Sequence, residues 1–251
     1  MNPAEFVNIA HTERDFWWYT GMRRILFTLL DPLVRGRKIK SVLEAGCGTG
    51  YNASALREHY GWEMYGLDLE MEGLRYGRPL GLANLIQADI ASLPFRSETF
   101  QAVVSLDVIV HFPLGEEHKP LAEFSRVLAP GGLLVLRVAA LDILRSRHSQ
   151  FAHERQRFTA KRLVRAVTRE GVRVLRCTYA NSVLLPVALA KFRVWEPLLR
   201  RPPQSGVLPV GRRLNRLLQA PLAAEDRWLS KGRNLPLGQS LILIGERQTH
   251  R

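Results

Sequence analysis

Three glycines at alternate positions follow a short apolar segment, and they constrain this chain more than any other stretch does. Residues 42–50 read Val-Leu-Glu-Ala-Gly-Cys-Gly-Thr-Gly, with Gly46, Gly48 and Gly50 at every second place. Glycines at this spacing let the backbone turn sharply and let a ligand lie against main-chain N–H groups. Because a helix is predicted from about 52 to 60, the stretch predicts a nucleotide-type cofactor site at the carboxyl end of a parallel strand.

The spacing of these glycines separates the loop from two common phosphate-binding loops. A dinucleotide fingerprint requires G-x-G-x-x-G, and a P-loop requires Gly-Lys-Ser/Thr. Here the third glycine comes one residue early, no lysine follows it, and Glu44 stands two residues before the first glycine. A carboxylate at that place would repel phosphate, so the loop belongs to neither class.

Apolar runs that alternate with helical patterns predict a parallel sheet covered on both faces. The fold class we predict is α/β, with a Rossmann-like, seven-stranded, mostly parallel sheet whose last strand is antiparallel and lies at the edge. Asp68, Asp89 and Asp107 each stand at the end of one predicted strand, which brings three carboxylates to the carboxyl edge of the sheet. The predicted strands are 40–43, 63–67, 84–90, 100–106, 133–138, 172–179 and 240–246.

Taken together, these features resemble the class I S-adenosylmethionine (SAM)-dependent methyltransferases over about residues 40–138. The resemblance rests on the glycine loop, Asp68, Asp89, Ser-Leu-Asp at 105–107 and Arg-Val-Leu-Ala-Pro-Gly-Gly at 126–132. It implies SAM as the cofactor and S-adenosylhomocysteine as the product. SAM has no pyrophosphate and carries an amino-acid tail, so a carboxylate beside the loop can serve its ammonium group or an ordered water near it.

The same resemblance implies which residues contact the cofactor. Asp68 stands where a carboxylate holds the ribose diol, and Asp89 where a residue accepts from the adenine amino group. One position departs from the family pattern, since many relatives have an acidic residue before the histidine that follows the fourth strand, and this chain has Val110 before His111. The full expected cofactor set is Glu44, Gly46, Cys47, Gly48, Gly50, Asp68, Leu69, Asp89, Ile90, Leu106 and Asp107.

Three histidines are the candidate general bases for a hydroxyl or carbon acceptor. His111 follows the fourth strand, where the family places residues beside the methyl group, and a structural histidine that caps the helix is the alternative. His148 and His153 lie in a loop that can close over the same opening, and their spacing predicts no metal site. The expected acceptor contacts are Trp18, Tyr19, Arg155 and Arg157, for which packing or a solvated surface is the alternative.

The two halves of the chain differ strongly in charge. Residues 1–137 contain 14 basic and 16 acidic residues, whereas 138–251 contain 22 and 7. A basic half usually meets nucleic acid, anionic lipid or a phosphorylated substrate, although 30 of the 36 basic residues are arginine, which also fits biased codon usage. Without a membrane-spanning run, a signal peptide or a disulfide framework, we expect a cytoplasmic protein that makes peripheral contact with the inner face of an anionic membrane.

The predicted domain organisation has a small cap and one large domain. Residues 1–39 form the expected N-terminal helical cap, and residues 40–251 form the methyltransferase domain. Between its last two strands, about 182–236 is an insert that is by turns proline-rich, arginine-rich and apolar. We interpret this insert as a lid or a membrane-facing flap, with a packing decoration as the alternative.

The predicted function is methyl transfer from SAM to an O, N or C atom of a small-molecule, natural-product, lipid-linked or glycan-linked acceptor. An RNA methyltransferase is one alternative, which the net charge of +13 favours. Against it, the fourth strand ends without the Asn/Asp-Pro-Pro-Tyr type of loop that stacks a flipped base. A SAM-binding partner subunit without catalysis is the other alternative, and the sequence predicts no oligomeric state.

Overall fold

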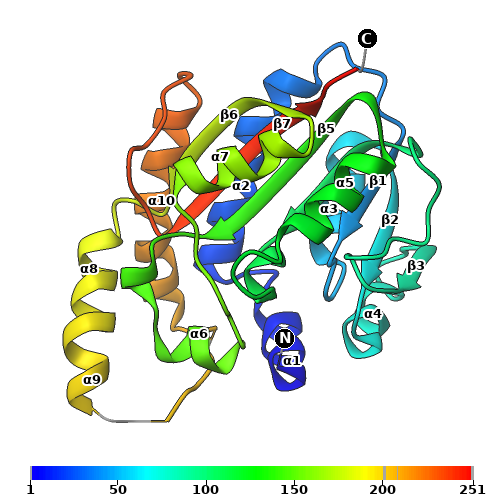
Figure 1. The fold of residues 1–251 in the computed structure, drawn as a ribbon. Coiled ribbons are helices and arrows are strands. Elements are labelled where there is room, and N and C mark those ends of the chain that lie inside the picture. Colours follow the sequence, from blue (N-terminus) through cyan, green and yellow to red (C-terminus); the bar gives the residue numbers. More distant parts are fainter. Residues whose placement is uncertain (1, 200–201, 208, 250–251) are drawn as a thin grey trace.

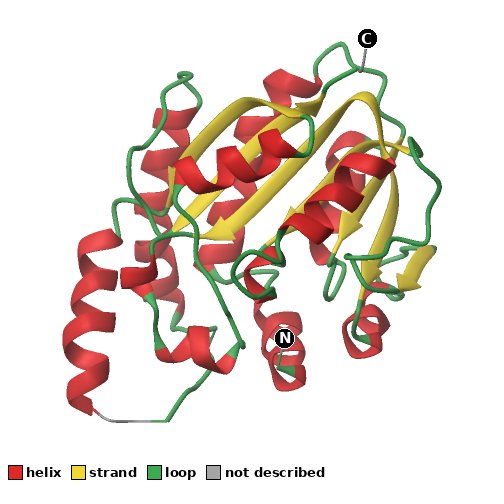
Figure 2. Ribbon diagram, in the orientation of Figure 1, coloured by secondary structure: helices red, strands yellow, loops and turns green. Residues whose placement is uncertain are grey.

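A seven-stranded sheet lies between two layers of helices (Figures 1 and 2). The computed structural model describes residues 2–199, 202–207 and 209–249. Strand order is β3-β2-β1-β4-β5-β7-β6, and only the pairs that involve β7 are antiparallel among the described strands. The predicted fold class is therefore confirmed. The strands are β1 (Ser41–Ala45), β2 (Glu63–Asp68), β3 (Asn84–Gln87), β4 (Phe100–Leu106), β5 (Leu128–Ala139), β6 (Val172–Ala180) and β7 (Ser240–Arg247).

The last strand lies inside the sheet, so its predicted place at the edge is wrong. β7 pairs with β5 on one side and with β6 on the other. Its first six residues are all buried, whereas β6 keeps Arg173 exposed and Arg176 partly exposed. An edge strand tolerates such charges better than an interior strand does, and this difference assigns the edge to β6.

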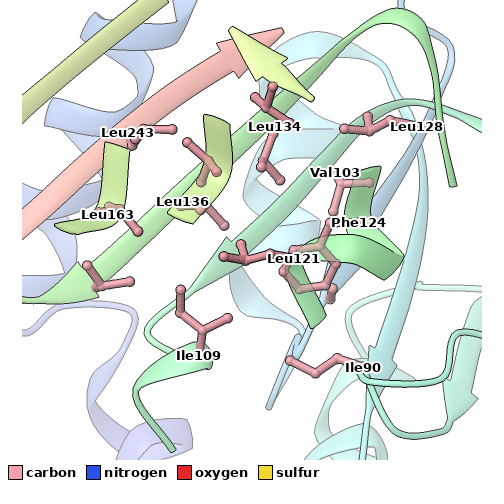
Figure 3. Close-up of a cluster of buried hydrophobic side chains, with 14 of the residues drawn as sticks. Ile90, Val103, Ile109, Leu121, Phe124, Leu128, Leu134, Leu136, Leu163 and Leu243 are labelled. Carbon is pink, nitrogen blue, oxygen red and sulfur yellow. The ribbon is translucent and has the colours of Figure 1, made fainter. Parts of the chain in front are cut away.

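One face of the sheet is covered by α2 (Trp17–Val34), α3 (Tyr51–Tyr60) and α10 (Arg212–Leu229), whose apolar side chains join one buried cluster. The other face is covered by α5 (His118–Val127) and α7 (Ala160–Arg169). Figure 3 shows Leu121 and Phe124 of α5 and Leu163 of α7 beside strand residues of this second cluster. The apolar residues recur three or four positions apart, so each helix buries one side.

One helix continues past a proline, and one predicted strand boundary moves. Helix α2 continues past the Asp31-Pro32 pair to Val34, because Pro32 stands in the last turn and removes a single helical hydrogen bond there. Strand β3 ends at Gln87, three residues earlier than predicted, so Asp89 and Ile90 lie in the turn that follows.

Several short helices gather at the end of the sheet where the parallel strands finish (Figure 1). This arrangement puts them around the edge that carries the candidate site. They are α1 (Pro3–Thr12), η1 (Ile109–His111), η2 (Asp142–Leu144), α6 (Arg147–Phe151), α8 (Leu185–Ala190), η3 (Lys191–Trp195) and α9 (Glu196–Leu199). The remaining helix, α4 (Met71–Gly77), packs beside β2 and β3.

Segment 182–236 consists of two structurally different parts. Helix α10 packs along α2, and a Cβ added to Gly21 would lie 2.3 Å from Cδ1 of Leu222. The hydroxyl of Thr28 also donates to Asp226 at 2.6 Å, so α10 is a layer of the fold. In contrast, η3 and α9 have no buried residue among those described, which leaves the run from α8 to α9 on the outside.

Candidate cofactor and acceptor site

The glycine loop has a backbone that other residues rarely adopt. Gly46, Gly48 and Gly50 have φ values of +81°, +55° and +77°. A Cβ on Gly46 would lie 2.4 Å from Val108, and one on Gly50 would lie 2.7 Å from Leu82. Two of the three glycines are therefore required by close packing as well as by conformation.

The middle of the loop is more open. A Cβ on Gly48 would meet one described atom within 4 Å, the Cε1 of Phe6 in α1, at 3.8 Å. Its neighbour Cys47 turns inward, where a Cβ on Gly66 would approach its sulfur at 3.0 Å. Burial raises the pKa of the Cys47 thiol, so this side chain packs as a small neutral group and leaves the loop backbone to face outward.

Asp68 ties the loop to the end of β2. Its Oδ2 accepts from the Gly48 N–H at 2.8 Å and its Oδ1 from the Glu70 N–H at 3.0 Å. Burial raises the pKa of Asp68, and these two hydrogen bonds oppose the increase. The adjacent Leu69 is 58% exposed, which gives this edge an apolar surface beside a carboxylate. Asp89 is exposed and accepts from the Ala91 N–H at 2.8 Å, so it caps its own turn.

Two buried polar atoms beside the loop have no hydrogen-bond partner among the described residues. One is Oε2 of Glu44, which is 1% exposed and precedes the loop. The other is Nη1 of Arg23 on α2, whose guanidinium lies 4.5 Å from the ring centroid of Tyr51, the residue after the loop. Buried polar atoms nearly always have partners, so this pair fits a ligand with one cationic and one anionic group.

Glu13 joins the end of the N-terminal helices to the loop. Its Oε2 accepts from the Thr49 hydroxyl at 2.5 Å. Burial raises the pKa of Glu13 to about 7, which the Thr49 hydrogen bond and the nearby Arg23 oppose. Sequence reasoning missed Glu13 and Arg23 because it treated residues 1–39 as an apolar cap. The available signal was the position of Arg23, a charged residue between Met22 and Ile25 on the apolar side of a predicted helix.

At the end of β4, a carboxylate is paired with a buried arginine. Asp107 has a φ of +62°, its Oδ2 accepts from Nε of Arg137 at 2.7 Å, and the same oxygen forms an ion pair with Nη2 of Arg137 at 2.7 Å. The Arg137 guanidinium lies 4.9 Å from the ring centroid of Trp18, and Tyr19 packs edge-on against Trp18 at 5.1 Å. Burial raises the pKa of Tyr19, so its hydroxyl stays protonated. The N-terminus of α2 is thus positioned over the ends of β4 and β5.

The structure brings together two of the three candidate histidines. Nδ1 of His111 lies 3.3 Å from the carbonyl oxygen of His153, a geometry in which Nδ1–H donates and Nε2 remains an acceptor. Burial lowers the pKa of His111 to about 4, so its imidazole is neutral at pH 7 and not half-protonated near pH 6.5. His153 is exposed and contributes its backbone to this contact. Among the described residues, no three His, Cys, Asp or Glu side chains form a metal-binding group.

His148 lies in a different contact. Its Nδ1 accepts from the Gly206 N–H at 3.0 Å and lies 3.7 Å from Oε1 of Glu5. The same Glu5 oxygen accepts from the Ser205 hydroxyl at 2.9 Å. Burial lowers the pKa of His148, so the neutral ring connects α1, α6 and the 202–207 segment.

The two candidate arginines differ in exposure. Arg157 is buried, and its guanidinium donates to Glu154 at 2.6 Å, to the Ala140 carbonyl at 3.1 Å and to Ser149 at 2.9 Å. Through these contacts the Arg157 side chain stabilises the loop to which it belongs. Arg155 is exposed, and its backbone N–H donates to the Val110 carbonyl at 2.9 Å, which holds the loop beside η1.

Comparison with known proteins points to one family. Residues 43–136 match the family described as "Methyltransferase domain". The chain is 38% identical over 97 residues to a fatty-acid O-methyltransferase of Mycolicibacterium smegmatis, a match that covers 37% of this chain and 35% of the relative. An O-methyltransferase of Pyrenophora dematioidea is 25% identical over 199 residues, with 74% and 69% covered. A probable tRNA methyltransferase 9B of Mus musculus is 34% identical over 102 residues, with 40% and 22% covered.

Several of these relatives are only partly matched, and the chain spans between about a fifth and two thirds of their length.

Solved structures resemble the whole fold at low sequence identity. A putative sarcosine dimethylglycine methyltransferase from Galdieria sulphuraria has a TM-score of 0.60 at 15% identity, with 90% of this chain and 86% of that chain covered. A chain from the complex of the Haloferax volcanii Trm112 methyltransferase activator with a putative methyltransferase has a TM-score of 0.58 at 19% identity and 98% coverage of both.

The buried state of Glu44 predicts a pH-dependent change in stability. Burial raises the pKa of Glu44 to about 8, against 4.5 when exposed, while the Ala53 N–H and Arg137 oppose the increase. The native state then binds a proton that the unfolded chain releases, so stability is lost as pH rises from about 4.5 to about 8. We expect Glu44→Gln to remove this loss and to gain up to about 1.4 kcal/mol over the wild type per pH unit in that range.

Urea unfolding of both proteins at pH 5, 6.5 and 8 measures this difference. The exposed Glu116 provides a matched control, since Glu116→Gln removes a carboxylate whose pKa its neighbour Lys119 lowers below 4.5. The stability difference for that control is expected to stay constant. An equally constant difference for Glu44→Gln would contradict a buried, mostly protonated Glu44.

Proposed function

We propose that this chain is a class I SAM-dependent methyltransferase and that it transfers the methyl group of SAM to a small acceptor with an apolar, lipid-like part. The observation that carries the cofactor assignment is the pair of unpartnered buried atoms, Oε2 of Glu44 and Nη1 of Arg23, on either side of the glycine loop. A carboxylate on the ligand matches the guanidinium of Arg23, and an ammonium on the same ligand would donate to Glu44 and favour the ionised form of that carboxyl. The methionine part of SAM carries both.

The remaining cofactor residues take separate roles in this proposal. Asp68 would hold the ribose diol, since its carboxylate lies at the end of β2 and is already fixed to the loop. Leu69 and the buried Ile90 would enclose the adenine, and Asp89 would accept from its amino group. The N–H groups and bare Cα atoms of the loop would let the ligand approach the backbone closely.

SAM supplies a methyl group already activated on a sulfonium, so the protein has to position the acceptor, exclude water and take up a proton where one is released. For a hydroxyl acceptor, Nε2 of His111 would receive that proton. A His111 pKa near 4 makes it a weaker base than an ordinary histidine, but it is unprotonated throughout the neutral range. A carboxylate acceptor would need no base.

The acceptor class is inferred from relatives and from surface chemistry. Relatives include a fatty-acid O-methyltransferase and a malonyl-[acyl-carrier protein] O-methyltransferase, both named for acyl acceptors. Trp18 and Tyr19 are aromatic residues near the ends of β4 and β5, and the exposed Arg155 provides a cation for an acidic head group. An RNA acceptor is the second candidate, because a probable tRNA methyltransferase also matches over about 100 residues.

Calorimetric titration with S-adenosylhomocysteine tests the cofactor site. We expect Asp68→Ala to weaken binding by roughly tenfold or more, because a charge-assisted hydrogen bond contributes about 1.5–3 kcal/mol. Gly48→Val should abolish binding, since its side chain enters the open centre of the loop. Two controls match these changes: Asp142→Ala removes an exposed aspartate, and Gly36→Val places valine at a φ of +77° with no described atom within 4 Å of its Cβ. Near-normal affinity in both site variants would contradict the assignment.

The role of His111 is tested by the pH dependence of methyl transfer. A panel of fatty acids, a bacterial lipid extract and transfer RNA, each incubated with SAM labelled on the methyl group, first identifies an acceptor. His111→Gln should then lower kcat by about 10²–10⁴ for a hydroxyl acceptor and leave S-adenosylhomocysteine affinity within a few-fold. Because the folded pKa is about 4, kcat/KM of the wild type should stay level from pH 8 to about 5. A decline centred near pH 6.5, or full turnover in the variant, would place the base elsewhere.

A further inference from the structure

The run from α8 through η3 to α9 exposes an unusual number of apolar side chains. Val187, Val194, Trp195 and Leu198 are each more than half exposed, and Leu198 reaches 75%. Their spacing puts them on one side of the helical run, with Lys191 between them. Figure 1 shows this run at the outer side of the molecule, at the end of the sheet that carries the cofactor site. Exposed apolar groups gathered in this way mark an interaction surface.

The stretch of sequence that follows this run is basic. Residues 197–224 contain five arginines and no Asp or Glu. Three of them, Arg212, Arg213 and Arg216, are exposed at the start of α10 together with Leu214 and Leu217. The acidic residue within the run, Glu196, is turned inward, where its Oε2 accepts from the Arg147 N–H at 2.8 Å.

We propose that the run 185–199 and the first turns of α10 dock on the surface of an anionic lipid bilayer. Leucine, valine and tryptophan enter the headgroup region, while lysine and arginine pair with acidic headgroups. Nucleic acid is a poorer match, because it offers phosphates for the arginines and little for the leucines and valines. Within the part of the chain that the structure describes, none of the helices could span a bilayer.

The docking surface is connected to the N-terminal helix α1. Glu196 holds α6 through Arg147, and the next residue of α6, His148, contacts Glu5 on α1 and Gly206 in the 202–207 segment. Helix α6 therefore joins the run 185–199 to α1 and to the 202–207 segment. The idea that the acceptor itself comes from the bilayer rests on the proposed methyl transfer. The binding of lipid at this surface does not depend on that proposal.

Vesicle flotation with the full chain tests the docking surface. The probes are vesicles of phosphatidylcholine alone and vesicles that contain 30% phosphatidylglycerol by design, at physiological salt. We expect enrichment on the anionic vesicles, and a loss of roughly tenfold or more in the partition coefficient for Leu198→Ser combined with Trp195→Ser. The triple change of Arg212, Arg213 and Arg216 to Gln should reduce the anionic preference by a similar factor.

Matched controls distinguish binding through this surface from non-specific adsorption to vesicles. The control variant combines Leu114→Ser with Trp228→Ser, which changes a leucine that is 73% exposed and a tryptophan that is 43% exposed, both outside the proposed surface. This variant should float like the wild type. Three outcomes would each overturn the proposal. The first is equal flotation on neutral and anionic vesicles, and the second is unchanged flotation of the surface variants. The third is tight, salt-sensitive binding of transfer RNA that is weakened by the Leu198 and Trp195 changes. S-adenosylhomocysteine affinity, measured in parallel, distinguishes failure here from failure of the proposed function.

Discussion

The proposed cofactor site depends on the way the carbonyl oxygen of Leu67 holds the glycine loop. It accepts from the N–H of Gly46 at 2.7 Å and from the N–H of Cys47 at 2.8 Å, so the loop turns around the end of β2. Asp68, the next residue, then reaches the Gly48 N–H at 2.8 Å. These three contacts fix the loop before any ligand binds, and preorganisation of this kind reduces the entropy that binding costs.

Residues from distant parts of the chain complete the site around that loop. Glu13 comes from the turn after α1, Arg23 comes from α2, and Arg137 comes from β5. All three are buried ionisable groups, and each contacts at least one residue of the glycine loop, beside that loop or at the end of β4. Burying such groups is costly unless they are paired, so the unpartnered Nη1 of Arg23 is best explained by a function. In the proposed function, the N-terminal helices therefore contribute to cofactor recognition as well as to coverage of the sheet.

The sequence was sufficient for the fold class because alternating apolar runs and glycine spacing are local patterns, and the same patterns put Asp68 and Asp107 at strand ends. Contacts between remote segments have no local pattern. The place of β7 between β5 and β6 depends on which strand can tolerate exposed arginines, and the contact between His148 and Gly206 spans 58 residues. The pKa of His111 also follows from burial, which a sequence motif does not report.

We expect Arg23 to hold the amino-acid tail of SAM beside the glycine loop, and the most direct test is calorimetry with two ligands. S-adenosylhomocysteine has the amino-acid tail, whereas methylthioadenosine lacks it. Arg23→Met is expected to weaken the first by roughly tenfold to a hundredfold and to leave the second unchanged, while Arg24→Met, an exposed neighbour, affects neither. Equal losses for both ligands would show that Arg23 supports the fold and would contradict this expectation.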